Sequence, residues 1–190
     1  MLLRKLVPVA ILLAAAAVAQ QTQPRRTPDV PFVPTTPEAV QAMLKLADVK
    51  KTDIVYDLGC GDGRIVVAAA KDFGAHAVGI DINPQRVAEA TDNVKKAGMQ
   101  DRVRIVEGDL FTADIHEATV VTLFLLSAVN EKLRPKLLQD LRPGTRVVSN
   151  TFRMGDWKPE KTITLDDTNG QENYLSHTLY LWTIPPHGSK

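Results

Sequence analysis

The sequence predicts an α/β fold with a doubly wound, mostly parallel sheet and a C-terminal antiparallel strand pair. Helix and strand patterns alternate between residues 37 and 149, which is typical of a parallel sheet covered by helices. Two strand patterns, at 161–165 and 178–184, then follow with no helical pattern between them and predict the antiparallel pair. Glycines at 59–63 directly follow the first strand pattern, an order that marks the ligand-binding corner of such sheets.

The individual elements are predicted from periodicity and from signals at their ends. Val40, Met43 and Leu44 recur at helical spacing after Pro37, with Thr36 placed to cap that helix. In chain order we expect a helix from 37, a strand at 54–58, a helix at 65–71, a strand at 77–80, a helix at 83–97, strands at 103–106 and 120–126, a helix at 131–141 with Pro135 in its first turns, a strand at 146–149, and a turn at 166–170 between the last two strands. The run at 120–126 is expected to be a central strand, apolar throughout.

Composition limits the class of protein. The chain has 190 residues, 44% hydrophobic and 24% charged, which suits one globular domain at 37–190 with a core of its own. The net charge of +1 shows no basic excess, so we expect no nucleic-acid partner, and we expect a monomer. Cys60 is the only cysteine and the four histidines lack metal-ligand spacing, so the sequence predicts neither an internal disulfide nor a metal site.

The N-terminus differs in kind from the rest of the chain. Arg4 and Lys5 precede an uncharged apolar run at 6–19, which ends in a small-x-small pattern at 17–19. This layout predicts a secretory signal peptide at 1–20 and an exported protein, periplasmic or secreted. The run is shorter than the ~20 residues of a spanning helix, but an uncleaved anchor that associates the chain with a membrane is the alternative. Residues 21–36 are predicted to be a proline-rich linker.

The stretch D-L-G-C-G-D-G at 57–63 indicates what the corner binds. Gly59, Gly61 and Gly63 allow a ligand to approach the backbone closely and allow positive φ. Their spacing is one residue tighter than the dinucleotide fingerprint. Asp57, at the strand end, would repel a pyrophosphate but would suit a ligand that carries an ammonium and a sulfonium. Both features count against a nicotinamide-dependent oxidoreductase.

Further acids follow the next strands. Asp81 ends the second strand, where a carboxylate accepts hydrogen bonds from ribose hydroxyls, and Asp109 follows the third strand, where it can accept from an adenine amino group. Asp62 lies within the glycine loop. Any one of these acids alone would be explained by a helix cap or a solvated turn. Their recurrence at successive strand ends predicts a nucleoside-type ligand at this edge of the sheet.

These motifs together resemble the class I (seven-strand, Rossmann-like) methyltransferases that use S-adenosylmethionine (SAM). The match consists of 57–63, G-I-D at 79–81, E-G-D-L at 107–110 and R-P-G at 142–144, and the resemblance covers 37–190. It implies that SAM is the cofactor, that Asp57 to Gly63 line its methionine part, that Asp81 holds the ribose and that Asp109 holds the adenine. The predicted cofactor-binding residues are Asp57, Gly59, Cys60, Gly61, Gly63, Asp81, Ile82, Asp109 and Leu110.

A narrower resemblance concerns the methyl acceptor. P-F-V-P at 31–34, G-D-G-R-I-V at 61–66, F-L at 124–125, E-K-L at 131–133 and R-V-V-S at 146–149 are similar to a small lysine N-methyltransferase family. That family includes the mitochondrial enzymes that methylate the ATP synthase c-subunit and the adenine nucleotide translocator. The resemblance implies a protein lysine as the acceptor, with a membrane protein as one possible substrate. It leaves open whether 31–34 is a flap over the cofactor or a rigid linker.

Methyl transfer is an in-line displacement that depends mainly on positioning, and a lysine acceptor, with its free pKa of ≈ 10.4, must first lose its proton. No catalytic residue is identified. The acceptor pocket is expected at 125–130, which lacks the N-P-P-Y motif of amide and adenine methylation. Asn130 is expected to cap a helix, Asn150 and Thr151 are candidates for lining the pocket, and His177 is expected to be a sheet residue.

The alternatives to a protein-lysine methyltransferase are a small-molecule methyltransferase and an exported, non-catalytic SAM-binding module.

Overall fold

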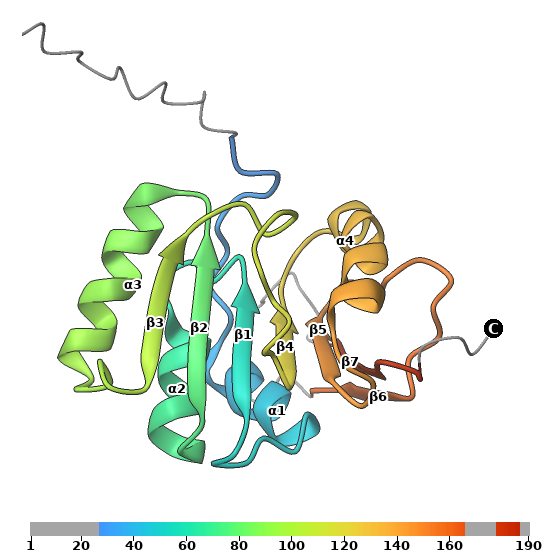
Figure 1. Ribbon diagram of the computed structural model, residues 1–190, viewed down its shortest axis with the longest axis horizontal. Coiled ribbons are helices and arrows are strands. Elements are labelled where there is room, and N and C mark those ends of the chain that lie inside the picture. The colour runs from blue at the N-terminus through green and yellow to red at the C-terminus, as the bar shows by residue number, and fades with distance from the viewer. Residues whose placement is uncertain (1–26, 166–177, 187–190) are drawn as a thin grey trace, which may run out of the picture.

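The protein folds around one seven-stranded sheet in the order β3-β2-β1-β4-β5-β7-β6 (Figure 1). The structure is a computed structural model in which residues 27–165 and 178–186 are described. The strands are β1 (Ile54–Leu58), β2 (His76–Asp81), β3 (Val103–Glu107), β4 (Val120–Leu123), β5 (Arg146–Asn150), β6 (Lys161–Thr164) and β7 (Thr178–Thr183). β1 to β5 are mutually parallel, while β7 runs antiparallel to both β5 and β6. The predicted fold class is therefore confirmed. The turn predicted at 166–170 and His177 lie outside the described residues.

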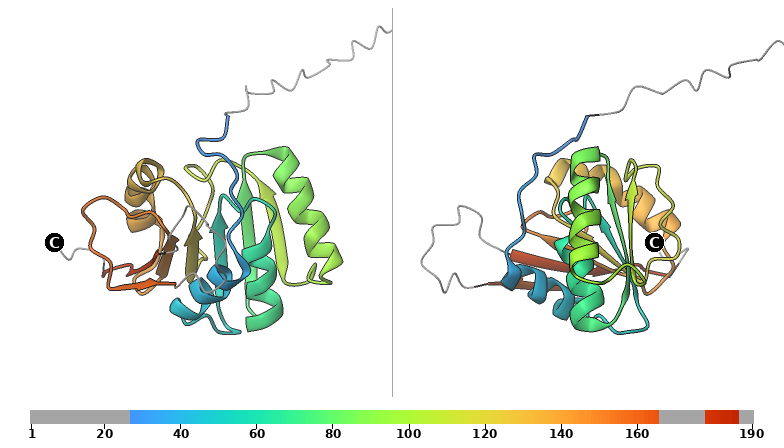
Figure 2. Two further views of the ribbon diagram at one scale, coloured as in Figure 1. Left: turned by 180° about the vertical axis from the view of Figure 1, so that it is seen from behind. Right: turned by 90° about the vertical axis from the view of Figure 1, so that its left-hand side faces the viewer.

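Helices cover both faces of the sheet (Figure 2). They are α1 (Pro37–Leu46), α2 (Arg64–Phe73), α3 (Pro84–Lys96) and α4 (Ser127–Asp140). One core cluster packs α1, α2 and α3 on the first face through residues such as Leu44, Val66 and Val94. The second cluster packs α4 on the opposite face through Leu133 and Leu137. Alternate residues of the inner strands serve the two clusters, as the period of a strand requires: in β7, Leu179 belongs to the first and Tyr180 to the second.

The helix starts agree with the sequence-based predictions except at α4. Thr36 caps α1, where its hydroxyl accepts a hydrogen bond from the Ala39 amide, and Asn83 caps α3 by accepting one from Gln85. The helix predicted at 131–141 is present as α4, but its predicted start was wrong: it begins at Ser127, Pro135 lies well inside it, and Asn130 is not its cap. Leu126 occupies the N-cap position without a side-chain hydrogen bond, so the sequence contains no cap signal there.

The fourth strand is shorter than predicted. β4 ends at Leu123, opposite the last residue of β1, and the chain then leaves the sheet. Phe124 and Leu125 are apolar because they line a cavity, not because they continue the strand. The strand is also not apolar throughout, since Thr122 lies fully buried in it. Among the described residues, no helix is long and apolar enough to cross a membrane.

Candidate cofactor site

The glycine loop lies at the carboxyl ends of β1 and β2. The amides of Gly59 and Cys60 both donate to the carbonyl of Ile80, at 2.8 and 3.0 Å, which fastens the loop to the end of β2. Gly61 has φ +54°, and a Cβ built on it would lie 2.2 Å from the ring of Phe32. Position 61 therefore requires glycine both for its left-handed backbone and for the ring packed against it.

Asp57 is a buried carboxylate at the bottom of the cavity. It is 3% exposed, and one of its oxygens accepts a 2.8 Å hydrogen bond from the hydroxyl of Thr122 on the neighbouring strand β4. The pKa of Asp57 is raised to about 7, chiefly by burial. The nearby carboxylates of Asp81 and Asp62 add to this rise, and the hydrogen bond from Thr122 opposes it. Such a site binds a cation well, because a positive ligand relieves the desolvation of the carboxylate.

Asp81 connects the second strand to the loop. One of its oxygens accepts from the amide of Gly61 and the other from the amide of Asn83, each at 2.9 Å. Each oxygen keeps a further lone pair for a hydroxyl donor. Asp109 is oriented by the amide of Phe111, which donates to its carboxylate at 2.9 Å. The acids that were expected from the strand ends thus lie around one cavity, and backbone amides orient Asp81 and Asp109.

The predicted residues divide into those that line the cavity and those that shape the loop. Asp57, Gly59, Cys60, Asp81, Ile82, Asp109 and Leu110 line the cavity. Gly61 lies beneath Phe32, and Gly63 lies against Ala90 of α3, so these two glycines permit close packing within the protein. Burial raises the pKa of the Cys60 thiol, so this group stays neutral and packs against Gly79. All nine residues stay predictions as SAM ligands.

Asp62 has a structural partner. The guanidinium and backbone of Arg64 donate to its carboxylate, with the shortest contact at 2.6 Å. Burial would raise the pKa of Asp62, but the hydrogen bonds and charge of Arg64 outweigh burial and lower it. The third guanidinium nitrogen of Arg64, Nη1, donates to the carbonyl of Thr35 at 2.6 Å. Asp62 and Arg64 therefore hold the segment before α1 against the glycine loop.

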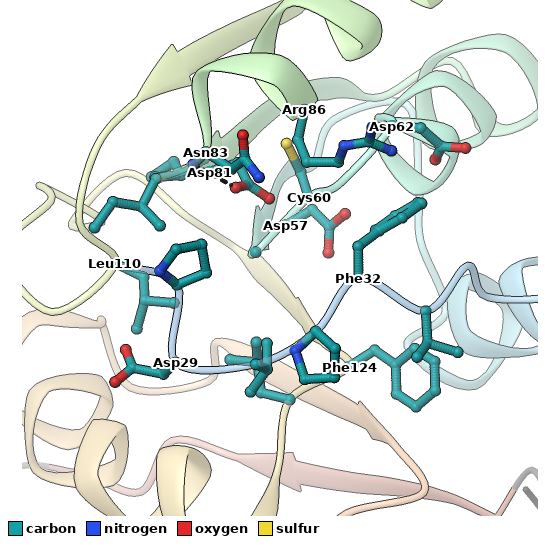
Figure 3. A pocket seen from close by; sticks show the side chains of 18 of the residues that line it. Asp29, Phe32, Asp57, Cys60, Asp62, Asp81, Asn83, Arg86, Leu110 and Phe124 are labelled. Carbon is teal, nitrogen blue, oxygen red and sulfur yellow. Dashed lines mark hydrogen bonds between the residues drawn. The ribbon is translucent and has the colours of Figure 1, made fainter. Parts of the chain in front are cut away.

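This segment, residues 28–35, forms one wall of the cavity and is named the flap below. All eight of its residues line the cavity. Figure 3 shows it running across the cavity, with Phe32 on the side of Asp62 and Arg86, and with Asp29 on the side of Leu110. The guanidinium of Arg86 lies 4.7 Å from the centre of the Phe32 ring. Of the two interpretations of 31–34, this arrangement is the one expected of a flap.

Two residues of the site have no counterpart among the sequence predictions. Arg86 meets Phe32 only because the flap passes α3, and no local pattern marks this arginine. Thr122 could have been noticed as the one polar residue within an apolar strand pattern.

Among residues 27–165 and 178–186, no group of three or more His, Cys, Asp or Glu could hold a metal ion.

The residues present fit SAM on chemical grounds. A desolvated carboxylate suits the ammonium and sulfonium, oriented carboxylates suit the ribose and adenine donors, and a mostly apolar flap forms one wall. The fold and this site define a SAM-dependent methyltransferase. A family model described as the ANTKMT methyltransferase domain matches residues 57–161, and the chain belongs to this family.

Relatives and solved structures agree on this class. A protein-lysine N-methyltransferase of Saccharolobus islandicus is 52% identical over 84% of this chain and 97% of its own length. An ATP synthase c-subunit lysine N-methyltransferase of Xenopus laevis is 34% identical over 69% of this chain, which spans only 57% of that relative. A crystal structure described as an RNA methyltransferase from Salinibacter ruber, in complex with S-adenosyl-L-homocysteine (SAH), superposes with a TM-score of 0.75. The sequence of that structure is 54% identical to this chain, and the match covers 80% of this chain and 94% of the chain in that structure.

Proposed function

We propose that this methyltransferase transfers its methyl group to the side-chain amine of a protein lysine. The observation that supports this proposal most directly is the 52% identity to an archaeal protein-lysine N-methyltransferase over nearly its whole length. The segment after β4 supports it as well, because Phe124 and Leu125 are apolar and 125–130 lacks the N-P-P-Y motif of amide and adenine methyltransferases. An amide or a nucleobase as methyl acceptor would need the polar groups of that motif. The amine of a lysine stands on an alkyl stem, and apolar walls suit that stem.

The chain's residues act by binding and positioning. SAM, when bound, supplies an electrophilic methyl group on a sulfonium. Asp57 pairs with the ammonium of the methionine part, and Thr122 keeps its carboxylate oriented. Asp81 binds the ribose, and the flap excludes water from the cavity. The lysine must arrive neutral or lose its proton on the way, and none of the described residues is assigned as the base.

The test is methyl transfer from tritiated SAM into an extract of source cells that lack the gene. Label is expected in protein, recovered as methyllysine after acid hydrolysis. An Asp81→Ala variant should lose SAM affinity in a calorimetric titration because it removes the ribose contacts, and it should label nothing. Label found only in small molecules would contradict the lysine acceptor and leave the methyltransferase class intact.

A second candidate acceptor is RNA. The observation that favours it is the 54% identity to the Salinibacter ruber protein, which is described as an RNA methyltransferase. The net charge of +1 gives no general attraction to a polyanion. The same labelled extract separates the two acceptors: ribonuclease would release the label if RNA were the acceptor, and protease would release it if a protein were.

We further propose that residues 1–20 take the chain to a membrane, either as a cleaved export signal or as an anchor. Support comes from the basic start, the apolar run at 6–19 and the small residues at 17–19. Cell fractionation with N-terminal sequencing tests this proposal: a mature start near residue 20 supports export, and an intact N-terminus in the membrane fraction supports the anchor. An intact chain that is wholly in the soluble cytosolic fraction would refute both.

A further inference from the structure

A strained turn follows β5 near the cavity. Thr151 has φ +65°, a left-handed conformation that is rare for a β-branched residue. The amide of Phe152 donates to the carbonyl of Asn150 at 2.7 Å, so the turn closes over only three residues. This is the strained form of a γ-turn. Such conformations persist where the surrounding structure holds them, and they are common at functional sites.

Two contacts from outside the turn hold it: the amide of Thr151 donates to the carbonyl of Thr178 on β7 at 2.7 Å, and Asn130 of α4 holds the Phe152 end. The side chain of Asn130 is fully buried, and its amide nitrogen lies 3.1 Å from the carbonyl oxygen of Phe152 and 3.2 Å from the hydroxyl of Ser149. The carbonyl of Arg153 is a third, longer partner at 3.4 Å. The Ser149 hydroxyl also donates to the carbonyl of Phe152, at 2.7 Å. Because several acceptors face one nitrogen, the amide orientation of Asn130 is determined.

The turn places the ring of Phe152 against the ring of Phe124. Their centroids lie 6.2 Å apart with 28° between the planes, a stacked pair. Phe124 lines the cavity, whereas Phe152 does not and is half-buried. The stacked pair therefore extends the aromatic surface from a residue of the cavity lining to a residue beside it. Val129, which also lines the cavity, directly precedes Asn130 in α4.

We propose that Phe124 and Phe152 form the wall of the channel by which the acceptor lysine reaches the cofactor, and that Asn130 is the positioning residue that holds Phe152 in place. This inference rests on the proposed lysine acceptor. An aromatic surface suits both parts of a lysine, since the four-carbon stem packs on the ring and the charged head gains from its face. The strain at Thr151 is then explained, because a relaxed turn would point Phe152 elsewhere.

The test uses two analogues in which a nitrogen replaces the sulfur of SAM. One, the amine arm, reaches through two carbons to a secondary amine that bears a butyl group, so that the amine lies near the transferred carbon and the butyl group stands for the lysine stem. The other, here called the methyl arm, has a methylene in place of that amine. Calorimetry on the full chain compares both analogues with SAH. In the wild-type protein the amine arm is expected to bind more tightly than the methyl arm. Phe152→Ala should weaken binding of the amine-arm analogue by about tenfold and leave SAH affinity within about twofold.

Asn130 is tested by rescue. Asn130→Ala should weaken the amine-arm analogue by about fivefold. Adding Thr151→Gly to that variant should restore part of the loss, because glycine adopts the left-handed turn without strain.

Two controls guard against variants that do not fold. Phe152→Leu replaces Phe152→Ala if the latter does not fold, and unchanged SAH affinity reports folding in every variant. Phe73→Leu, at the end of α2 on the first core cluster, is the matched control and should change neither affinity.

The outcomes separate this inference from the proposed function. If the amine arm binds better than the methyl arm in the wild type but Phe152→Ala changes nothing, the channel is wrong and the lysine acceptor stands. Equal losses for SAH and the analogue in Phe152→Ala would show a structural role only and would also overturn the channel. If the amine arm gives no advantage in the wild-type protein, the lysine acceptor itself fails and the channel fails with it.

Discussion

The buried carboxylate of Asp57 predicts that SAM affinity depends on pH near neutrality. Burial raises its pKa to about 7 in the unliganded protein. A bound ammonium favours the ionised carboxylate, so the pKa of Asp57 falls in the complex. Below pH 7, SAM must therefore displace a proton, and its affinity decreases as the pH falls. The expected loss is about five- to tenfold between pH 7.5 and pH 6, since one pH unit below the pKa changes the ionised fraction by about tenfold.

The assay is calorimetric titration with SAM at pH 6 and pH 7.5, in two buffers of different ionisation enthalpy. At pH 6 the binding heat should report release of about one proton per SAM. Asp57→Asn should bind SAM more weakly and with nearly equal affinity at both pH values. Thr122→Val removes a hydrogen bond that lowers the pKa of Asp57, so the midpoint of the affinity loss should move above pH 7. A flat wild-type profile, or a slope that persists in Asp57→Asn, would refute this account of Asp57.

The other predictions concern stability and the flap. Because the folded pKa of Asp57 lies above the 3.8 of an ordinary aspartate, the contribution of Asp57 to the stability of the unliganded protein should fall as pH rises from about 4 to about 7. Asp57→Asn should therefore be more stable than wild type at pH 8, by about 1–3 kcal/mol in urea unfolding. Phe32→Ala should speed SAM release in stopped-flow measurements because its ring covers Gly61, and it should do so more than Val33→Ala, an equally exposed change on the same flap. Asp53→Ala should lower the free energy of unfolding by about 3 kcal/mol with SAM affinity unchanged, because this 6% exposed carboxylate pairs with Arg146 and Thr119 at the opposite end of the sheet. The exposed Asp92→Ala control in α3 should leave stability nearly unchanged, and equal losses in the two variants would contradict the role of burial.

Much of the cofactor site could be predicted because its signals are local. The glycines at 59–63 directly follow β1, and Asp81 and Asp109 stand at or just after the ends of β2 and β3. The carboxyl ends of parallel strands meet at one edge of the sheet, so residues at those ends converge in any sheet of this class. The same reasoning failed for α4, because a helix that begins without a polar cap leaves no signal at its start.

The sequence by itself determined the class of fold, the order of its elements and the acids at the strand ends, because periodicity and turn chemistry act over a few residues. Only the tertiary structure decided which distant residues complete the site. Thr122 reaches Asp57 across 65 residues because β4 pairs with β1 in one register. Phe32 covers Gly61 because Arg64 holds the flap, and Asn130 meets Phe152 because α4 packs beside β5. Such contacts depend on register and packing between elements, which local patterns do not encode.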